Sequence, residues 1–400
     1  MTTVLVAVAV VALAVHVADL NVTSPGRPSS SGASTHWVNG SLPSGYFGSA
    51  SAISCVALDQ CLLLGSPQGD SNVNSVGGAS PSTVWQDTHN RWSSVSVAGP
   101  VVLNDLTCVS EEECWAVGFL VPPAGQTNDG ILQPVVERET GSGFQVVDSP
   151  QMTGLDELDA VTCPSADDCW AVGRYGSQTN SRSVATFQPL VEHFDGTSWQ
   201  AVTVPAPSTM SSLQLVTCPS TEVCWALGED SSQTPAVPLL EHYLGGAWTI
   251  APVPTSFPDS AITCVSSDDC WAVGGGSQPV AAHYTAGTWV AVPTLHLNVP
   301  SDGGSSLDGV ACLAATDCWA VGSITGPGWT GVGTPPPDLA RPLVEHYAGG
   351  SWVVGPTPQS IGSDFTLAPI TCIASSSTCY VLGRSAISLE NAVFEVLEDA

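Results

Sequence analysis

The chain contains no lysine and only seven arginines, against 36 aspartates and glutamates, so its formal net charge is −29. A surface this negative repels phosphate backbones, and we expect no nucleic-acid partner. Charged residues make up only 11% of the chain, well below the usual quarter, so the acidity is spread thinly and does not form a solvated tail. Helical periodicity of useful length is also lacking outside the N-terminus, which favours strands.

The N-terminus carries an apolar run at residues 4–15, "VLVAVAVVALAV". This run is too short for a comfortable membrane span, and it fits the apolar region of a secretory signal followed by a small-residue cleavage pattern. No Arg or Lys precedes it, so a retained membrane anchor remains the alternative. We expect a signal peptide or anchor over residues 1–18, a flexible Ser/Pro/Gly linker over 19–34, and a secreted or cell-surface protein.

A cysteine-containing stretch, "VTCPSADDCWAVG" at residues 161–173, recurs along the chain. Its seven copies begin at residues 53, 106, 161, 216, 262, 310 and 370, so they lie 46 to 60 residues apart. The first and last copies are degenerate, but together the seven copies use all 14 cysteines in pairs. A period of this size is that of a propeller blade.

Most copies have a second half at variable distance, such as "PLVEHFDGTSWQAVTV" at residues 189–204. Each copy then parses into four strands: the run ending at the first cysteine, "CWAVG", "PLVEHF", and the run that begins at the tryptophan. Gly, Pro, Asp and Ser bound these runs of β-branched and aromatic residues, as expected for hairpins. The sequence therefore predicts an all-β fold over residues 35–400, a seven-bladed β-propeller of four-stranded antiparallel blades.

The two ends of the repeat region complement one another. The seventh copy has three strands, the third at residues 392–397, and lacks the fourth strand with its tryptophan. A stretch at residues 34–44, "STHWVNGSLPS", precedes the first copy and resembles a fourth strand. We predict that Trp37 and its neighbours complete the last blade and close the ring.

Each cysteine pair flanks a turn of five residues, or six in the seventh copy, between the first and second strands of its copy. Opposed residues in such a hairpin are close enough for a disulfide. Zinc sites prefer shorter gaps and need four ligands together, so we expect no metal and no other cofactor. Seven disulfides indicate an oxidising compartment. The predicted pairs are Cys55–Cys61, Cys108–Cys114, Cys163–Cys169, Cys218–Cys224, Cys264–Cys270, Cys312–Cys318 and Cys372–Cys379.

The other recurrent residues favour structural roles. Alternation in "CWAVG" places the cysteine, alanine and glycine on one face of the strand, which can receive a tryptophan from the neighbouring blade. A Glu-His step recurs at Glu192-His193, Glu241-His242 and Glu345-His346. Adjacent strand residues point to opposite faces, so this step cannot act as a catalytic dyad. We expect no catalytic residues and favour a binding protein over an enzyme.

The "CWAVG" and "PLVEHFDGTSW" motifs resemble a repeat of secreted bacterial β-propellers, akin to sialidase-like and kelch-like proteins. This resemblance covers residues 35–400 and implies architecture without an activity. The Asp-box of sialidases is matched only in part by "FDGTSW" at residues 194–199. Sialidases also carry an arginine triad, and the seven arginines here show no repeated placement that suggests one.

Function is expected where the repeat is broken, in the loops between second and third strands. The longest of these loops, residues 323–340, carries Trp329. We predict that Trp329, Tyr175, Arg174 and Phe119 contact a glycan or a surface protein, and that the protein is a monomer. An extracellular polysaccharide hydrolase or lyase, with Asp129 or Asp338 as candidate carboxylates, is the alternative.

Overall fold

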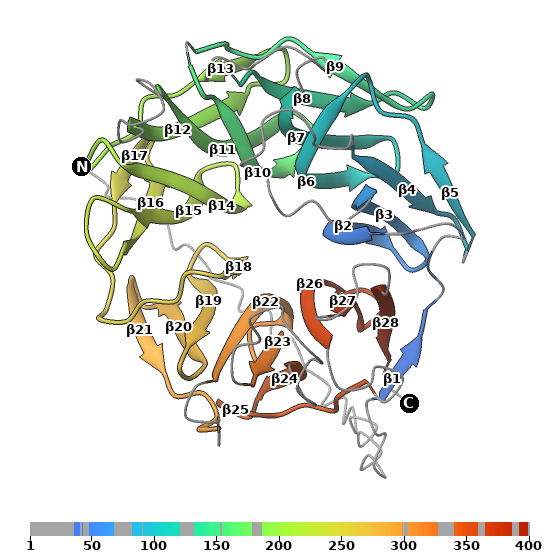
Figure 1. Ribbon diagram of the computed structural model, residues 1–400, viewed down its shortest axis with the longest axis vertical. Coiled ribbons are helices and arrows are strands. Elements are labelled where there is room, and N and C mark those ends of the chain that lie inside the picture. Colours follow the sequence, from blue (N-terminus) through green and yellow to red (C-terminus); the bar gives the residue numbers. More distant parts are fainter. Residues whose placement is uncertain are drawn as a thin grey trace, which may run out of the picture. The chain divides into compact units, whose positions relative to one another are not determined.

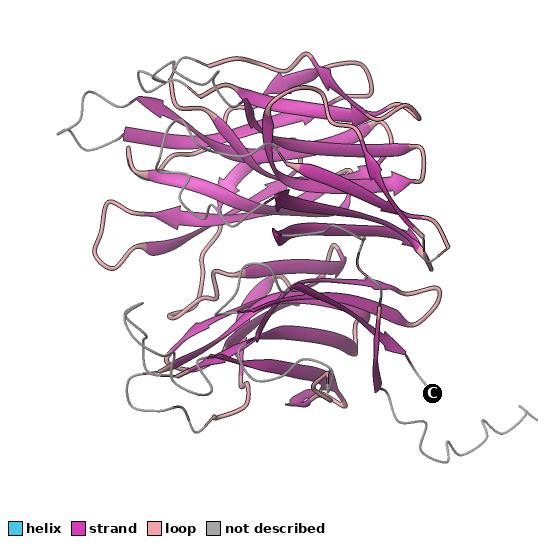
Figure 2. Cartoon of the chain, turned by 45° about the vertical axis from the view of Figure 1, so that its right-hand side comes forward, coloured by secondary structure: helices cyan, strands magenta, loops and turns pink. Residues whose placement is uncertain are grey.

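The computed structural model describes residues 36–40, 42, 48–67, 82–89, 91–120, 132–152, 154–177, 186–297, 299, 303–326, 340–358, 365–385 and 392–398. They belong to one compact unit, Thr35–Ala400. The signal or anchor and the linker predicted over residues 1–34 lie outside the described residues. Across the described ranges, the chain forms strands without helices (Figure 2), and no helix is long and apolar enough to cross a membrane.

The strands follow the repeat, four to a copy. The first two copies contribute β2 (Gly48–Ala57), β3 (Gln60–Pro67), β4 (Thr83–Asp87) and β5 (Trp92–Val95), then β6 (Val101–Ser110), β7 (Glu113–Leu120), β8 (Pro134–Glu139) and β9 (Phe144–Val147). Copies three and four contribute β10 (Glu157–Ser165), β11 (Asp168–Ser177), β12 (Thr186–Phe194) and β13 (Trp199–Ala201), then β14 (Ser211–Ser220), β15 (Val223–Asp230), β16 (Val237–Leu244) and β17 (Ala247–Ile250).

The remaining copies continue the same order. Copies five and six contribute β18 (Ala261–Ser266), β19 (Asp269–Gly276), β20 (Val280–Thr285) and β21 (Thr288–Val292), then β22 (Gly304–Ala314), β23 (Asp317–Thr325), β24 (Ala340–Ala348) and β25 (Ser351–Val354). The seventh copy contributes β26 (Phe365–Ile373), β27 (Thr378–Ser385) and β28 (Ala392–Glu398), and the N-terminal strand is β1 (His36–Asn39). One strand is shorter than predicted: β13 ends at Ala201, where the sequence suggested a strand to residue 204.

The strands pair antiparallel in sequence order within each copy. Among the described residues, five sheets have four strands, and a sixth sheet joins β18–β21 to β22–β25 through a pairing of β19 with β22. The sheets of this unit follow one another around a common centre, with the first strand of each copy innermost (Figure 1). Each first strand contacts the first strand of the next copy, and β26 contacts β2. The arrangement is therefore propeller-like.

The N-terminal strand pairs with the last copy. β1 lies antiparallel to β28, with Trp37 opposite Leu397, so the sheet order is β1-β28-β27-β26. Strands from opposite ends of the chain thus share one sheet, as predicted from the missing fourth strand.

The seven predicted disulfides are all present, with Cα atoms 3.9–4.1 Å apart in each pair. Each disulfide links the first and second strands of its copy. Seven such bonds indicate an oxidising, extracellular environment.

Tryptophans fill the space between neighbouring sheets, as predicted. Trp115 of β7 is fully buried and packs against Cys169 and Ala171 of the next copy. Its ring meets the ring of Trp199 edge-on, with centroids 5.3 Å apart. Equivalent clusters recur around Trp170, Trp225, Trp271 and Trp319. The small residues of "CWAVG" therefore make room for the tryptophan of the preceding copy.

Candidate functional site

A cavity of about 380 Å³ lies among the first strands of all seven copies. The first strand of every copy contributes lining residues, either from the strand itself or from the residue directly before it. These strands are β2, β6, β10, β14, β18, β22 and β26, and β27 adds one further residue. These are the strands nearest the centre in Figure 1. A single concave site thus receives side chains from every repeat.

A β-bulge places one residue of most copies at this cavity. The pairing of β10 with β11 shifts between Leu158 and Ala160, which leaves Asp159 as the extra residue. The same shift occurs four residues before the first cysteine in copies one, two, four and six. Bulges re-aim side chains, and they are common beside functional sites.

The glycine of "CWAVG" makes this bulge possible. A Cβ atom on Gly173 would lie 2.0 Å from the carbonyl oxygen of Glu157, and glycines 118, 228 and 322 meet the corresponding carbonyls at 1.9 to 2.1 Å. No other residue fits this close approach of the two strands. The recurrent glycine is therefore required by the backbone that shapes the cavity.

The residue at the cavity-lining position varies from copy to copy, whereas the residue before it is leucine in five of the seven copies. Six of the seven residues at this position are polar, and they differ in charge and hydrogen-bonding capacity. The seven are Ser51, Asn104, Asp159, Gln214, Ser260, Asp308 and Ala368. The repeat therefore varies on the innermost strands, at the central cavity, as well as in the loops.

The aspartates of the cavity have raised pKa values. Burial raises the pKa of Asp105 to about 6, although its carboxylate accepts hydrogen bonds from the Val161 and Leu106 amides at 2.9 Å. Burial and the neighbouring Glu157 raise the pKa of Asp159 to about 8. Desolvation disfavours the charged form in both cases. Asp159 therefore keeps its proton to a higher pH than an exposed aspartate does.

Arg384 brings a positive charge to the same cavity, beside Asp308. Burial raises the pKa of Asp308, and Arg384 together with the Ser306 hydroxyl opposes that rise. Arg384 lies opposite Thr366, as Arg174 lies opposite Glu157, so both arginines directly follow the glycine of the second strand. Alignment of "VGR" with "LGR" in the sequence shows this shared position, but two arginines do not make the triad of sialidases.

Of the four predicted contact residues, three do not line the central cavity, and the fourth lies outside the described residues. Arg174 forms an ion pair with Glu157 at 2.5 Å, and the Tyr175 hydroxyl donates to Gln188 at 2.7 Å. Phe119 is only 6% exposed. These three residues follow the glycine of a second strand, at the end that leads into the loop to the third strand, but they are not among the residues that line the central cavity.

Trp329, Asp129 and Asp338 lie outside the described residues, so the structure does not bear on their predicted roles.

The two residues of the recurrent Glu-His step face opposite ways in the described copies, as predicted. Glu192, Glu241 and Glu345 are fully buried, whereas the histidines beside them face the opposite way and stack on tryptophans. Ring centroids are 3.8 to 4.0 Å apart in these stacks, including that of His283 on Trp271. In the second copy, Arg138 takes the place of the histidine over Trp115. No group of three or more His, Cys, Asp or Glu residues in the described part of the chain could hold a metal ion.

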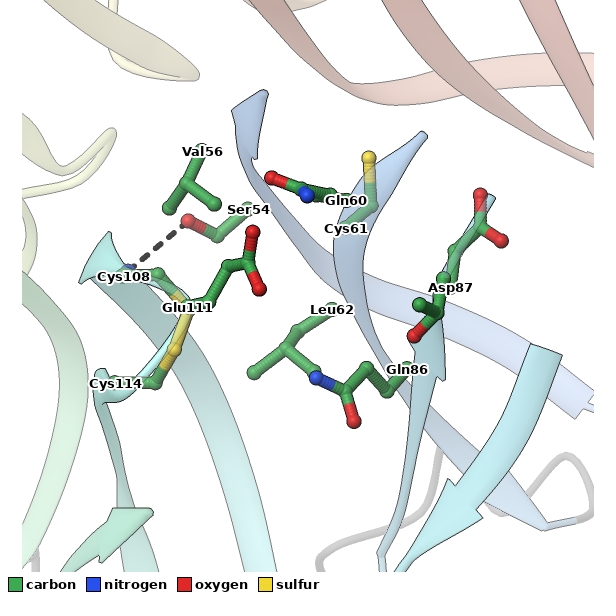
Figure 3. Close-up of a pocket in the computed structure, with 11 residues that line it drawn as sticks. Ser54, Val56, Gln60, Cys61, Leu62, Gln86, Asp87, Cys108, Glu111 and Cys114 are labelled. Atoms are coloured by element: carbon green, nitrogen blue, oxygen red, sulfur yellow. Dashed lines mark hydrogen bonds between the residues drawn. A yellow bond between two sulfur atoms is a disulfide. The ribbon is translucent and has the colours of Figure 1, made fainter. Parts of the chain in front are cut away.

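A second cavity, between copies one and two, measures only about 20 Å³. Figure 3 shows Leu62, Gln86 and Glu111 around it, and the Ser54 hydroxyl accepts a hydrogen bond from the Cys108 amide at 3.0 Å. This volume suffices for about one water molecule. The central cavity is therefore the better candidate for a binding site.

No family model and no curated protein matches the sequence. Solved structures do match in fold. YCF48 bound to a D1 peptide aligns with a TM-score of 0.54 and 11% identity over 91% of this chain and 95% of that chain. A polysaccharide lyase, an ulvan lyase bound to a saccharide of GlcA and Rha3S, aligns with a TM-score of 0.51 and 9% identity over 83% of this chain and 89% of that one. At such low identity, these likenesses show the all-β, propeller-like fold alone.

Proposed function

We propose that the chain is an exported, non-enzymatic binding protein, built as a seven-bladed propeller, that recognises a surface protein or glycan through its central cavity and the neighbouring loops. The observation that carries this proposal is the variation of the seven cavity-lining residues within an otherwise regular repeat. Packing alone favours the same residue in every copy, whereas recognition of an asymmetric partner requires different ones.

The seven-bladed ring is part of this proposal. Each copy supplies four strands when the eight-stranded sheet is divided between copies five and six, and β1 supplies the missing strand of the seventh copy. Contacts between successive first strands form a cycle that includes β26 with β2. These features support a closed ring, and the sequence motifs support kinship with secreted bacterial propellers.

Of the two partner classes, the charge of the site favours a protein segment with basic side chains. Asp105, Asp159 and Asp308 line the cavity with one arginine, Arg384, in a chain of net charge −29. An approaching cation favours the ionised form of a carboxyl group and lowers its pKa. The field of the whole chain would also steer a basic partner toward the site.

The test uses the oxidised full chain on an array of short peptides of graded charge and on a glycan array. We expect binding to basic peptides, weakened at least tenfold by Asp308→Asn and reduced by added salt, whereas Arg384→Ala removes the positive charge of the cavity and should strengthen it. Gln200→Ala, an exposed change on the outer strand β13, is the matched control and leaves binding unchanged.

Three outcomes would contradict the proposal. Binding to neither array removes the binding function, and equal binding by the cavity variants removes the site. Release of products from arrayed polysaccharides would favour the hydrolase or lyase alternative. Binding to glycans alone, lost in the cavity variants, would replace the protein partner with a glycan.

A further inference from the structure

A groove of about 420 Å³ lies between copies four and five, away from the central cavity. Its walls come from β17 with the segment that follows it and from the turn between β20 and β21. That turn is at the opposite end of its blade from the loop between β19 and β20, because successive strands are antiparallel. The groove therefore shares no lining residue with the central cavity and does not involve the loops between second and third strands.

The lining of the groove is mainly apolar and carries no formal charge. Trp225, Tyr284 and Trp289 contribute rings, Thr249 and Thr288 contribute hydroxyl groups, and His242 contributes an imidazole. No Asp, Glu, Arg or Lys is among the lining residues, although the chain as a whole is strongly acidic. Sites for small ligands have this volume and composition: apolar walls with a few placed polar groups.

His242 differs from the equivalent histidines of the other copies. His193, His283 and His346 each place Nε2 near an aspartate at the start of the second strand, at 3.3, 3.1 and 2.8 Å. Those aspartates directly precede the second cysteine of their copies, where the fourth copy has Val223.

The imidazole of His242 still stacks on Trp225, with centroids 3.8 Å apart, but Nε2 has no hydrogen-bond partner among the described residues. A buried polar atom without a partner costs about 1–3 kcal/mol, so the fourth copy gives up stability where the groove lies.

The chemistry of these groups selects a neutral, hydroxyl-bearing ligand. Burial lowers the pKa of His242, so its ring is neutral near pH 7. A neutral imidazole presents one donor and one acceptor nitrogen, and a hydroxyl group can satisfy either. An anion would meet no positive charge in the groove, and a cation would meet no carboxylate.

We propose that this groove binds a neutral pyranose unit of a glycan, with a sugar hydroxyl bonded to Nε2 of His242 and the apolar face of the ring against the apolar wall of the groove. The hydroxyl groups of Thr249 and Thr288 are available for further hydrogen bonds. The site is independent of the central cavity and of the partner proposed for it.

The test titrates the oxidised full chain with glucose, galactose, mannose and N-acetylglucosamine, and with glucuronate and glucosamine as charged counterparts. Changes in the indole signals of the NMR spectrum report binding. We expect saturable binding of at least one neutral sugar, and binding of the charged analogue of that sugar about tenfold weaker or absent.

Two substitutions locate the site. Thr249→Trp fills the groove from an exposed position and abolishes the response. Gln200→Trp, which also directly follows the tryptophan of a fourth strand, is the matched control and retains the response. Val223→Asp gives His242 the partner that the other copies have, and we expect about tenfold weaker binding because the new carboxylate competes for Nε2.

The proposal is overturned if none of the neutral sugars binds, or if Thr249→Trp responds like the unaltered protein. Equal affinity in Val223→Asp would remove His242 from the site. None of these results affects the peptide test of the central cavity, so the two proposals fail separately.

Discussion

The indole Nε1 of Trp37 donates a hydrogen bond to the carbonyl oxygen of Pro356 across 2.6 Å, although the two residues are 319 positions apart. Trp37 belongs to β1, which pairs with β28 of the seventh copy, whereas Pro356 follows β25 of the sixth. The half-buried ring of Trp37 packs on a core shared by these two copies. The N-terminal strand therefore stabilises two neighbouring sheets at once.

Removal of this strand is expected to destabilise the whole unit. Deleting residues 35–44 exposes the edge of β28 and should lower the melting temperature sharply. Trp37→Ala alone should reduce the free energy of unfolding by about 2 kcal/mol, less than for a fully buried tryptophan. Trp37→Phe keeps most of the packing and loses the hydrogen bond, at a cost of about 1 kcal/mol. Calorimetric melts that coincide for all variants would show that β1 does not hold the ring.

The recurrent glycine is expected to tolerate no side chain. Gly173→Ala would force a Cβ atom into the Glu157 carbonyl oxygen, and we expect a loss of roughly 3 kcal/mol, at the upper end of overpacking costs. Gly276→Ala is the control, since a Cβ atom there meets nothing within 4 Å. Urea denaturation of the two variants compares them directly. Equal midpoints would mean that the bulge can relax.

Each disulfide is expected to contribute stability separately. The double variant Cys163→Ala and Cys169→Ala reopens a short loop of the unfolded chain, which costs about 2 kcal/mol in the chain-entropy model. Reduction of all seven disulfides should have a much larger effect and lower the urea midpoint in proportion. If the fully reduced and the oxidised protein have the same urea midpoint, the disulfides have no role in stability.

The fold was predictable from the sequence because its determinants are local and repeated. The spacing of Cys163 and Cys169 defines a hairpin, and the small residues after Cys169 define the face that receives Trp115. The four strands of each unit predicted the four-stranded antiparallel sheets, and the incomplete seventh copy predicted the pairing of β1 with β28. None of these inferences required knowledge of how the sheets pack.

The candidate sites were not predictable in the same way. Asp159 lies on a bulge, where strict alternation fails, so its direction cannot be read from strand periodicity. The prediction from the loops selected Arg174, which does not line the cavity. It did not select Arg384, which lines the cavity from the degenerate seventh copy. The substitution of Val223 for aspartate is visible when the copies are aligned. The groove beside His242 is not, because a cavity depends on how all its neighbours pack.

Stability should fall as the pH rises from about 5 to 8, because several carboxyl groups are held neutral in the folded protein. Burial and the nearby Asp156 raise the pKa of Glu192 to about 8, and burial alone raises that of Glu241 to about 8. A carboxyl group whose folded pKa exceeds its unfolded value keeps its proton longer in the folded state. Its stabilising contribution is complete below the unfolded pKa, near 4.5, and is lost as the pH rises through the folded value.

Glu192→Gln tests the origin of this dependence, since the amide stays neutral at every pH. At about pH 8.5 the variant should be more stable than the unaltered protein. Its melting temperature should also depend less on pH between about 5 and 8.5, as measured by thermal melts. Glu112→Gln, at an exposed turn position, should leave the profile unchanged. A profile for Glu192→Gln that parallels the unaltered one would mean that Glu192 ionises in the folded protein without cost, and that water or a rearranged neighbour solvates its charge.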